Sequence, residues 1–216
     1  MVVVPIKPEY GPTLGHLLAP RWHAASRAAR RTVVLGGAAL LVALVAAVLT
    51  LENASYSHGG SVPFSFSYRD LYRVAPDPGG YVKVQRHSAN GALAESFAVD
   101  PLLLPPYTGE LSAEMPVFAA SYIRALGRRD SDFELRGEGK TKVNGVPAYD
   151  IFYTTSVDGR KMFGRDFLLL GEAKGAREGV AIVILLASGA SPSITSPAEV
   201  ATGSTLGRPL KSFSLG

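Results

Sequence analysis

The chain has 216 residues, a formal net charge of +4 and no cysteine. The absence of cysteine excludes disulfide bonds, thiol catalysis and lipid attachment at an N-terminal cysteine. Residues 1–31 carry the whole net charge, because they hold five basic residues and one acid, whereas the charges of residues 52–216 balance. The sequence pI of about 9.4 therefore reflects a basic tail, and we predict no nucleic-acid partner.

Residues 32–51 form an uncharged, apolar segment that reads TVVLGGAALLVALVAAVLTL. At about 1.5 Å per residue, a helix of this length spans about 30 Å, which is the thickness of the hydrocarbon core of a bilayer. We therefore predict one transmembrane helix at residues 32–51.

The basic residues before this segment predict its orientation. Arg27, Arg30 and Arg31 directly precede it, whereas the first basic residue after it is Arg69. The positive-inside rule then places the N-terminus in the cytoplasm and the C-terminal domain outside a plasma membrane that the chain crosses once. The apolar segment is longer than that of a secretory signal peptide, so an uncleaved signal anchor is favoured over a cleaved signal.

These observations divide the chain into four parts. Residues 1–31 are the cytoplasmic basic tail, 32–51 the transmembrane helix, 52–62 a polar linker rich in Gly and Ser, and 63–216 an extracytoplasmic domain. The domain has about 150 residues, which is enough for one compact core.

The first half of the domain predicts strands followed by a helix. Aromatic residues alternate with serines over residues 64–68, as in a half-buried strand. Residues 81–86 and 92–99 predict a hairpin around Asn90-Gly91. A helix is predicted at about residues 116–126, with proline in its first turn.

The second half predicts a series of strands and a final helix. Strands are expected at residues 133–143, 147–155, 160–170 and 179–187, with turns at Asn144-Gly145 and Asp158-Gly159. Ser196-Pro197-Ala198-Glu199 forms a capping box with proline at the first helical position, so a helix is expected to start there and to end near residue 203 or 207. Tight hairpin turns require antiparallel strands, and the predicted fold class is α+β with an antiparallel sheet.

Several segments of this series resemble a known family. They are GKTKVNGVPAYDIFYTT (139–155), GVAIVILLA (179–187), SPAEV (196–200) and PLKSF (209–213). The pattern resembles the PsbP-like fold and is similar to the actinobacterial LpqN-type lipoproteins and related membrane-anchored proteins. The resemblance implies an α/β/α sandwich, with helices on both faces of an antiparallel sheet, and a binding or assembly role. The lipoproteins carry a cysteine for lipid attachment, and this chain has an apolar helix in its place.

The sequence offers little for catalysis or metal binding. His87 is the one histidine of the predicted domain, and we expect it to be a solvated residue at a strand end. We predict no cofactor and no metal site, since metal sites draw on several His, Cys or carboxylate residues at set spacings. Asp150 is expected to point outward from its strand, and Asp166 lies in the neighbouring strand, so a suitable register would bring the two together. Arg165 and Lys161 are equally plausible partners for them.

Two functions follow as hypotheses. The first is a non-enzymatic binding or assembly module of the cell envelope, with an envelope protein or a lipid-like molecule as its ligand. The alternative is a carboxylate-dependent envelope hydrolase that uses Asp150 and Asp166. A pair of carboxyl groups about 5–10 Å apart in a pocket would favour the hydrolase.

Overall fold

The computed structural model describes residues 26–49, 53–108, 110–170, 177–202 and 206–216. The chain divides into two compact units, Met1–Leu51 and Glu52–Gly216. All the strands of the described chain belong to the second unit. The domain therefore starts about ten residues earlier than predicted.

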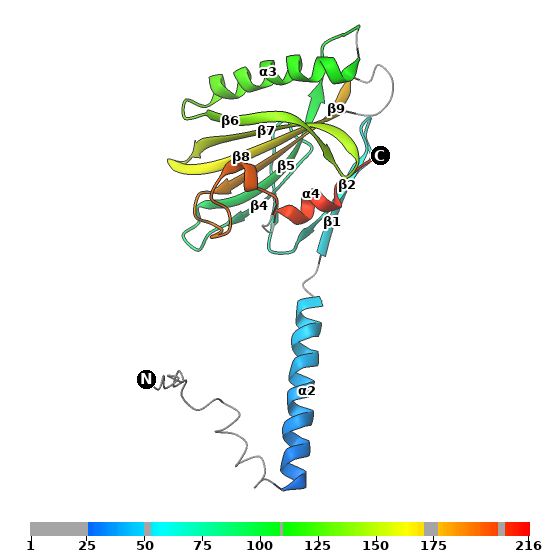
Figure 1. Ribbon diagram of the computed structural model, residues 1–216, viewed down its shortest axis with the longest axis vertical. Coiled ribbons are helices and arrows are strands. Elements are labelled where there is room, and N and C mark those ends of the chain that lie inside the picture. The colour runs from blue at the N-terminus through cyan, green and yellow to red at the C-terminus, as the bar shows by residue number, and fades with distance from the viewer. Residues whose placement is uncertain (1–25, 50–52, 109, 171–176, 203–205) are drawn as a thin grey trace, which may run out of the picture. The chain divides into compact units, whose positions relative to one another are not determined.

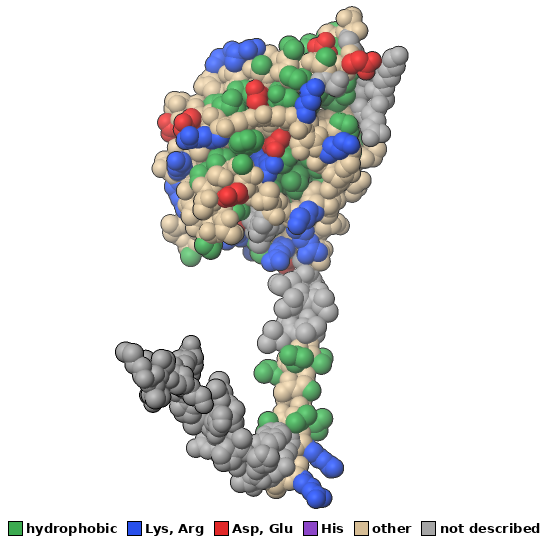
Figure 2. Space-filling model, viewed as in Figure 1, with side chains coloured by type: hydrophobic (Ala, Val, Ile, Leu, Met, Phe, Trp, Pro, Cys, Tyr) green, Lys and Arg blue, Asp and Glu red, His purple; other side chains and the backbone are tan. Residues whose placement is uncertain are grey.

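The first unit contains helix α2 (Arg27–Leu49), which covers most of the predicted transmembrane segment. Thr50, Leu51 and the side chains of residues 44–49 lie outside the described residues. Apolar side chains lie on the surface of its described part (Figure 2). Leu35 and Leu40 are among those that are more than half exposed. Within the described residues, no helix has both the length and the apolar character that crossing a membrane requires.

The arginines of the predicted orientation signal lie at the start of α2. The side chains of Arg27 and Arg31 are exposed, and that of Arg30 lies outside the described residues. The membrane anchor and its orientation stay predictions.

A seven-stranded antiparallel sheet forms the centre of the domain (Figure 1). Its strands, in spatial order, are β3 (Arg73–Ala75), β4 (Val82–His87), β5 (Leu93–Leu103), β9 (Glu178–Ala187), β8 (Arg160–Leu170), β7 (Val146–Val157) and β6 (Glu134–Val143). Asn144-Gly145 and Asp158-Gly159 have positive φ at both residues, as a type I′ turn requires, so these two predicted hairpins are confirmed. His87 is exposed at the end of β4, as expected.

A second, three-stranded sheet is built from the two ends of the domain. It contains β1 (Asn53–His58), β2 (Phe64–Arg69) and β10 (Ser214–Leu215), with β2 in the middle. The predicted linker at 52–62 is therefore wrong over β1. Its polar residues alternate with residues that face the domain, and the Tyr56 ring packs 5.8 Å from the Phe66 ring, centroid to centroid.

Helix α3 (Leu111–Arg129) covers one face of the large sheet (Figure 1). It begins five residues earlier than predicted, because Leu111 and Met115 also pack against the sheet, and Pro116 consequently lies inside the helix. The fully buried residues of this core include Ile151, Leu168, Leu104, Ala119 and Ala181, and Tyr149 and Tyr153 pack beside them.

The opposite face is covered by the small sheet, by the 3-10 turn η1 (Pro197–Glu199) and by the short helix α4 (Gly207–Ser212). The capping box at Ser196 is present, but the predicted long helix is wrong, since the chain leaves the helical conformation at Val200 (ψ 134°). The core on this face includes Phe66, Phe97, Val84, Ile182, Ile184, Leu169 and Leu206. The predicted α+β class is confirmed. The predicted sandwich has helices on both faces of the sheet, but among the described residues a long helix covers only one face.

Candidate functional site

The register of β7 and β8 places the two candidate aspartates on opposite faces of the sheet. Asp150 is paired with Phe167, and Ile151 is paired with Asp166. Directly paired residues share a face, and successive residues of a strand alternate between faces. The sheet backbone therefore separates the two carboxylates, and a hydrolase built on Asp150 and Asp166 as a pair is wrong.

Asp150 forms a bidentate ion pair with Arg165 that has a structural role. The Arg165 guanidinium donates from Nε to Oδ1 (3.0 Å) and from Nη2 to Oδ2 (2.7 Å) of Asp150. Its Nη1 donates to the carbonyl oxygens of Ala198 (2.8 Å) and Val200 (2.9 Å). Asp150 is 8% exposed, so the expectation that it points outward is wrong. Of the two expected partners the structure selects Arg165, which ties the η1 segment to the sheet.

Asp166 lies fully buried beneath α3, between two phenols. Tyr122 of α3 donates its hydroxyl to Oδ2 (2.9 Å), and Tyr153 of β7 donates to Oδ1 (3.0 Å). Burial raises the pKa of Asp166 to about 7, although both tyrosine hydrogen bonds act in the opposite direction. Burial likewise raises the pKa of Tyr122 and Tyr153 well above the usual value, so both phenols stay protonated as donors at neutral pH.

A glycine lets Tyr153 reach Asp166. Gly164 of β8 is paired with Tyr153, and a Cβ atom at Gly164 would overlap the Tyr153 ring. The ring therefore lies across the neighbouring strand, and its hydroxyl meets Asp166 two residues further along that strand. The sequence gives no sign of this contact, because it depends on a ring crossing an adjacent strand.

A second pair of aspartates, which the sequence did not indicate, meets beside the turn at residues 77–80. The carboxylates of Asp77 and Asp100 both border Gly80, where a side chain would overlap them. Burial, followed by the proximity of Asp77, raises the pKa of Asp100 to about 6. The buried Oδ2 of Asp77 has no hydrogen-bond partner among the described residues.

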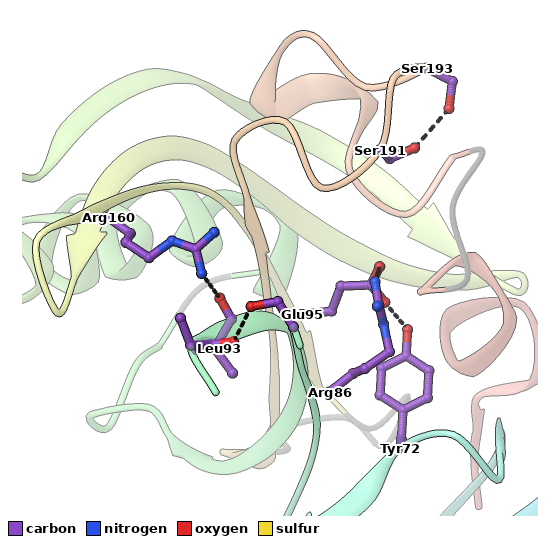
Figure 3. A network of polar contacts seen from close by, with 9 residues as sticks. Tyr72, Arg86, Leu93, Glu95, Arg160, Ser191 and Ser193 are labelled. Carbon is purple, nitrogen blue, oxygen red and sulfur yellow. Dashed lines mark hydrogen bonds and ion pairs between the residues drawn. The ribbon is translucent and has the colours of Figure 1, made fainter. Parts of the chain in front are cut away.

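An ion pair with a buried carboxylate lies beside the core on the face of the sheet opposite α3 (Figure 3). The carboxylate of Glu95 accepts from Arg86 Nη2 at 2.6 Å and from the Tyr72 hydroxyl. The side chain of Glu95 is 3% exposed, whereas that of Arg86 is 33% exposed. The hydrogen bond to Glu95 holds the pKa of Arg86 above its usual value. These three side chains stabilise the fold, because Tyr72 and Arg86 both donate hydrogen bonds to Glu95.

The unequal burial of this pair predicts unequal effects of mutation. Arg86→Met should lower the free energy of unfolding by about 3 kcal/mol, because it leaves a buried carboxylate with an uncompensated charge. Glu95→Gln should cost only about 1 kcal/mol, because the partly exposed arginine keeps its contact with water. Urea unfolding of both variants checks the difference, and equal losses would contradict this account of the pair.

Two hollows border α3. The first, of about 280 Å³, lies at the C-terminal end of the helix, and its lining includes Arg129, Phe133, Tyr153, Thr155 and Leu185. The second, of about 310 Å³, lies at the N-terminal end, and one of its lining residues, Leu170, directly precedes residues 171–176, which are outside the described part. The residues that line the first hollow are not adjacent in sequence to any residue outside the described part, and this hollow is the candidate site.

Comparison with known proteins identifies the fold. No family model matches the chain, and no curated protein matches it in sequence. The structure is similar to cyanobacterial PsbP (CyanoP) from Synechocystis, with 14% identity, a TM-score of 0.51 and coverage of 77% of this chain and 94% of that chain. It is also similar to LpqN, involved in cell envelope biogenesis of Mycobacterium tuberculosis (11% identity, TM-score 0.47, coverage 76% and 91%), and to the Saccharomyces cerevisiae Ran-binding protein Mog1p (12%, 0.46, 77% and 96%). The PsbP-like fold predicted from the sequence is confirmed.

Proposed function

We propose that this protein is a membrane-anchored, extracytoplasmic binding module of the cell envelope without enzymatic activity. The observation that carries the proposal is the hollow at the C-terminal end of α3, which combines apolar walls with the exposed guanidinium of Arg129. Six apolar residues line the hollow together with Arg129, Asp130, Thr155 and Ser156, and small-molecule sites combine apolar walls with a few placed polar groups.

The placement of the buried carboxylates favours binding over catalysis. Asp166 is fully buried, and each of its carboxylate oxygens accepts a hydrogen bond from a tyrosine hydroxyl. Asp150 is held by a bidentate arginine on the other face. A general acid or base must come within hydrogen-bond reach of its substrate. Neither carboxylate has a free path to a ligand in the hollow.

The anchor is supported by the sequence and by the exposed apolar side chains of α2. Residues 32–51 carry no charge, and the net positive charge of the chain precedes them. On the visible face of the domain, Lys and Arg side chains alternate with Asp and Glu (Figure 2). A domain without net charge is poorly suited to bind a polyanion such as nucleic acid.

Filling the hollow should abolish retention of a native ligand. The full chain would be purified from bacterial envelope membranes in mild detergent, and the organic molecules that accompany it would be identified by mass spectrometry. Leu185→Trp adds bulk inside the hollow, and the matched control Val117→Trp adds the same group on the exposed side of α3.

We expect a compound that accompanies the wild type and Val117→Trp and is at least about tenfold depleted in Leu185→Trp. Identical profiles for all three proteins, with no retained compound, would contradict the proposed function.

A further inference from the structure

We infer that the hollow at the C-terminal end of α3 binds a small amphiphile through a single anionic group. In this arrangement the anionic group pairs with Arg129, and the apolar part lies on the sheet between Tyr153 and Leu185. The inference rests on the proposed binding function and specifies its ligand class.

Arg129 is the free cation at this site. It is the last residue of α3, its side chain is exposed, and it lines the hollow without a hydrogen bond or ion pair to any described residue. Its charge acts against the rise in the pKa of Asp166, Tyr122, Tyr153 and Asp100 that burial causes, so the positive field extends to the inner wall. A guanidinium presents five N–H donors in a planar fork that matches a carboxylate or phosphate.

The acidic residues near Arg129 leave its charge available. Asp130 also lines the hollow, but its Oδ1 accepts the backbone N–H of Asp132 at 2.9 Å, in the turn that ends α3. Asp166 is behind the wall, and burial raises its pKa to about 7; burial also raises the pKa of Asp100, on which the charge of Arg129 acts as well, to about 6, so part of each carboxyl group is protonated at neutral pH. An anion is therefore favoured at Arg129, and a cation is not.

The floor of the hollow is formed by the Tyr153 ring and by Leu185. Tyr153, Gly164 and Leu185 are paired across β7, β8 and β9, so the side chains of Tyr153 and Leu185 face α3. The Tyr153 ring lies over Gly164, and Val183 adds a further apolar wall. A volume of about 280 Å³ is just below the usual range for ligand sites, about 300–1,000 Å³, so the ligand is small.

Hexanoate, hexanol and hexylamine test the inference on the full chain in an uncharged detergent. These probes share an alkyl chain and differ in the charge of the head group, and their dissociation constants can be measured by ligand-observed NMR. We expect hexanoate to bind at least about tenfold more tightly than hexanol, and hexylamine more weakly than both. The preference for hexanoate should decrease as salt is added.

Arg129→Gln should weaken hexanoate binding at least about tenfold and leave hexanol binding unchanged. Arg128→Gln is the matched control, because Arg128 is an exposed arginine at the same end of α3 that does not line the hollow. Equal affinity for hexanoate and hexanol, equal effects of the two substitutions, or no binding of hexanoate would each overturn the inference. If the Leu185→Trp variant still loses a native compound in any of these cases, the proposed function stands and only the ligand class is wrong.

Discussion

Asp166 is expected to make the domain less stable as the pH rises from about 4 to about 7, in contrast to the usual behaviour of buried, paired carboxylates. The pKa of Asp166 is about 7 in the folded chain against an ordinary 3.8, so the folded state binds this proton more tightly than the unfolded state. Stability is then highest below the unfolded pKa, falls between the two values and is constant above the folded one. The difference between the two pKa values corresponds to a loss of about 4 kcal/mol in the free energy of unfolding. Asp100, with a pKa of about 6, acts in the same direction.

Asp166→Asn should remove most of this dependence. An asparagine is neutral at every pH and still offers an oxygen to one tyrosine, while its amide can donate to the hydroxyl oxygen of the other. Relative to wild type, the variant should therefore gain about 4 kcal/mol between pH 4 and pH 8, measured by urea unfolding of the full chain. Asp132→Asn removes a carboxyl group at an exposed position and is the matched control. A difference for Asp166→Asn that stays constant with pH would contradict the raised pKa.

The second large effect is expected from Gly164→Ala, which should cost about 3 kcal/mol. The new methyl group would overlap the Tyr153 ring and force it away from β8. Overpacking of this kind costs about 1–3 kcal/mol, and the hydrogen bond from Tyr153 to Asp166 is lost as well. Urea unfolding at pH 5 and at pH 8 measures the loss.

Two further variants of the chain test the cause of this loss of stability. Gly139→Ala adds the same methyl group on β6, where nothing lies within 4 Å of the new atom, and should change stability by less than about 0.5 kcal/mol. Tyr153→Leu combined with Gly164→Ala should cost less than the sum of the two single changes, because the shorter side chain removes the overlap. Additive losses would show that the glycine acts through the backbone and not through the ring.

The sequence alone is enough to predict that Asp150 and Asp166 lie on opposite faces of the sheet. The two-residue turn at Asp158-Gly159 pairs Val157 with Arg160, and counting back along both strands pairs Asp150 with Phe167. Adjacent positions of a strand point to opposite faces, so this turn alone separates the carboxylates. Strands β6, β7 and β8 were predicted to within two residues for the same reason, because alternation and Asn-Gly or Asp-Gly turns are local signals.

The remaining features depend on contacts that local patterns do not encode. Tyr122 and Asp166 come from a helix and a strand 44 residues apart, and their meeting requires the packing of α3 on the sheet. The predicted helix at Ser196 has a correct start signal, but Arg165 binds the carbonyl oxygens of Ala198 and Val200, and such carbonyls would accept backbone N–H groups in a continuing helix. The polar composition of β1 concealed a strand because half of its residues face solvent.

The order of strands in the sheet has a consequence for how the chain acquires its fold. Strand β5 pairs with β9, so that Glu95 is opposite Leu186, and Leu215 near the end of the chain pairs with Phe64 in β2. Such distant pairings close long loops before they yield contacts, which slows folding. The β4–β5 hairpin and the hairpins of β6, β7 and β8 can form locally, whereas the other edge of β5 must wait for β9 to be synthesised. That edge is therefore unpaired during this interval and open to association with other chains.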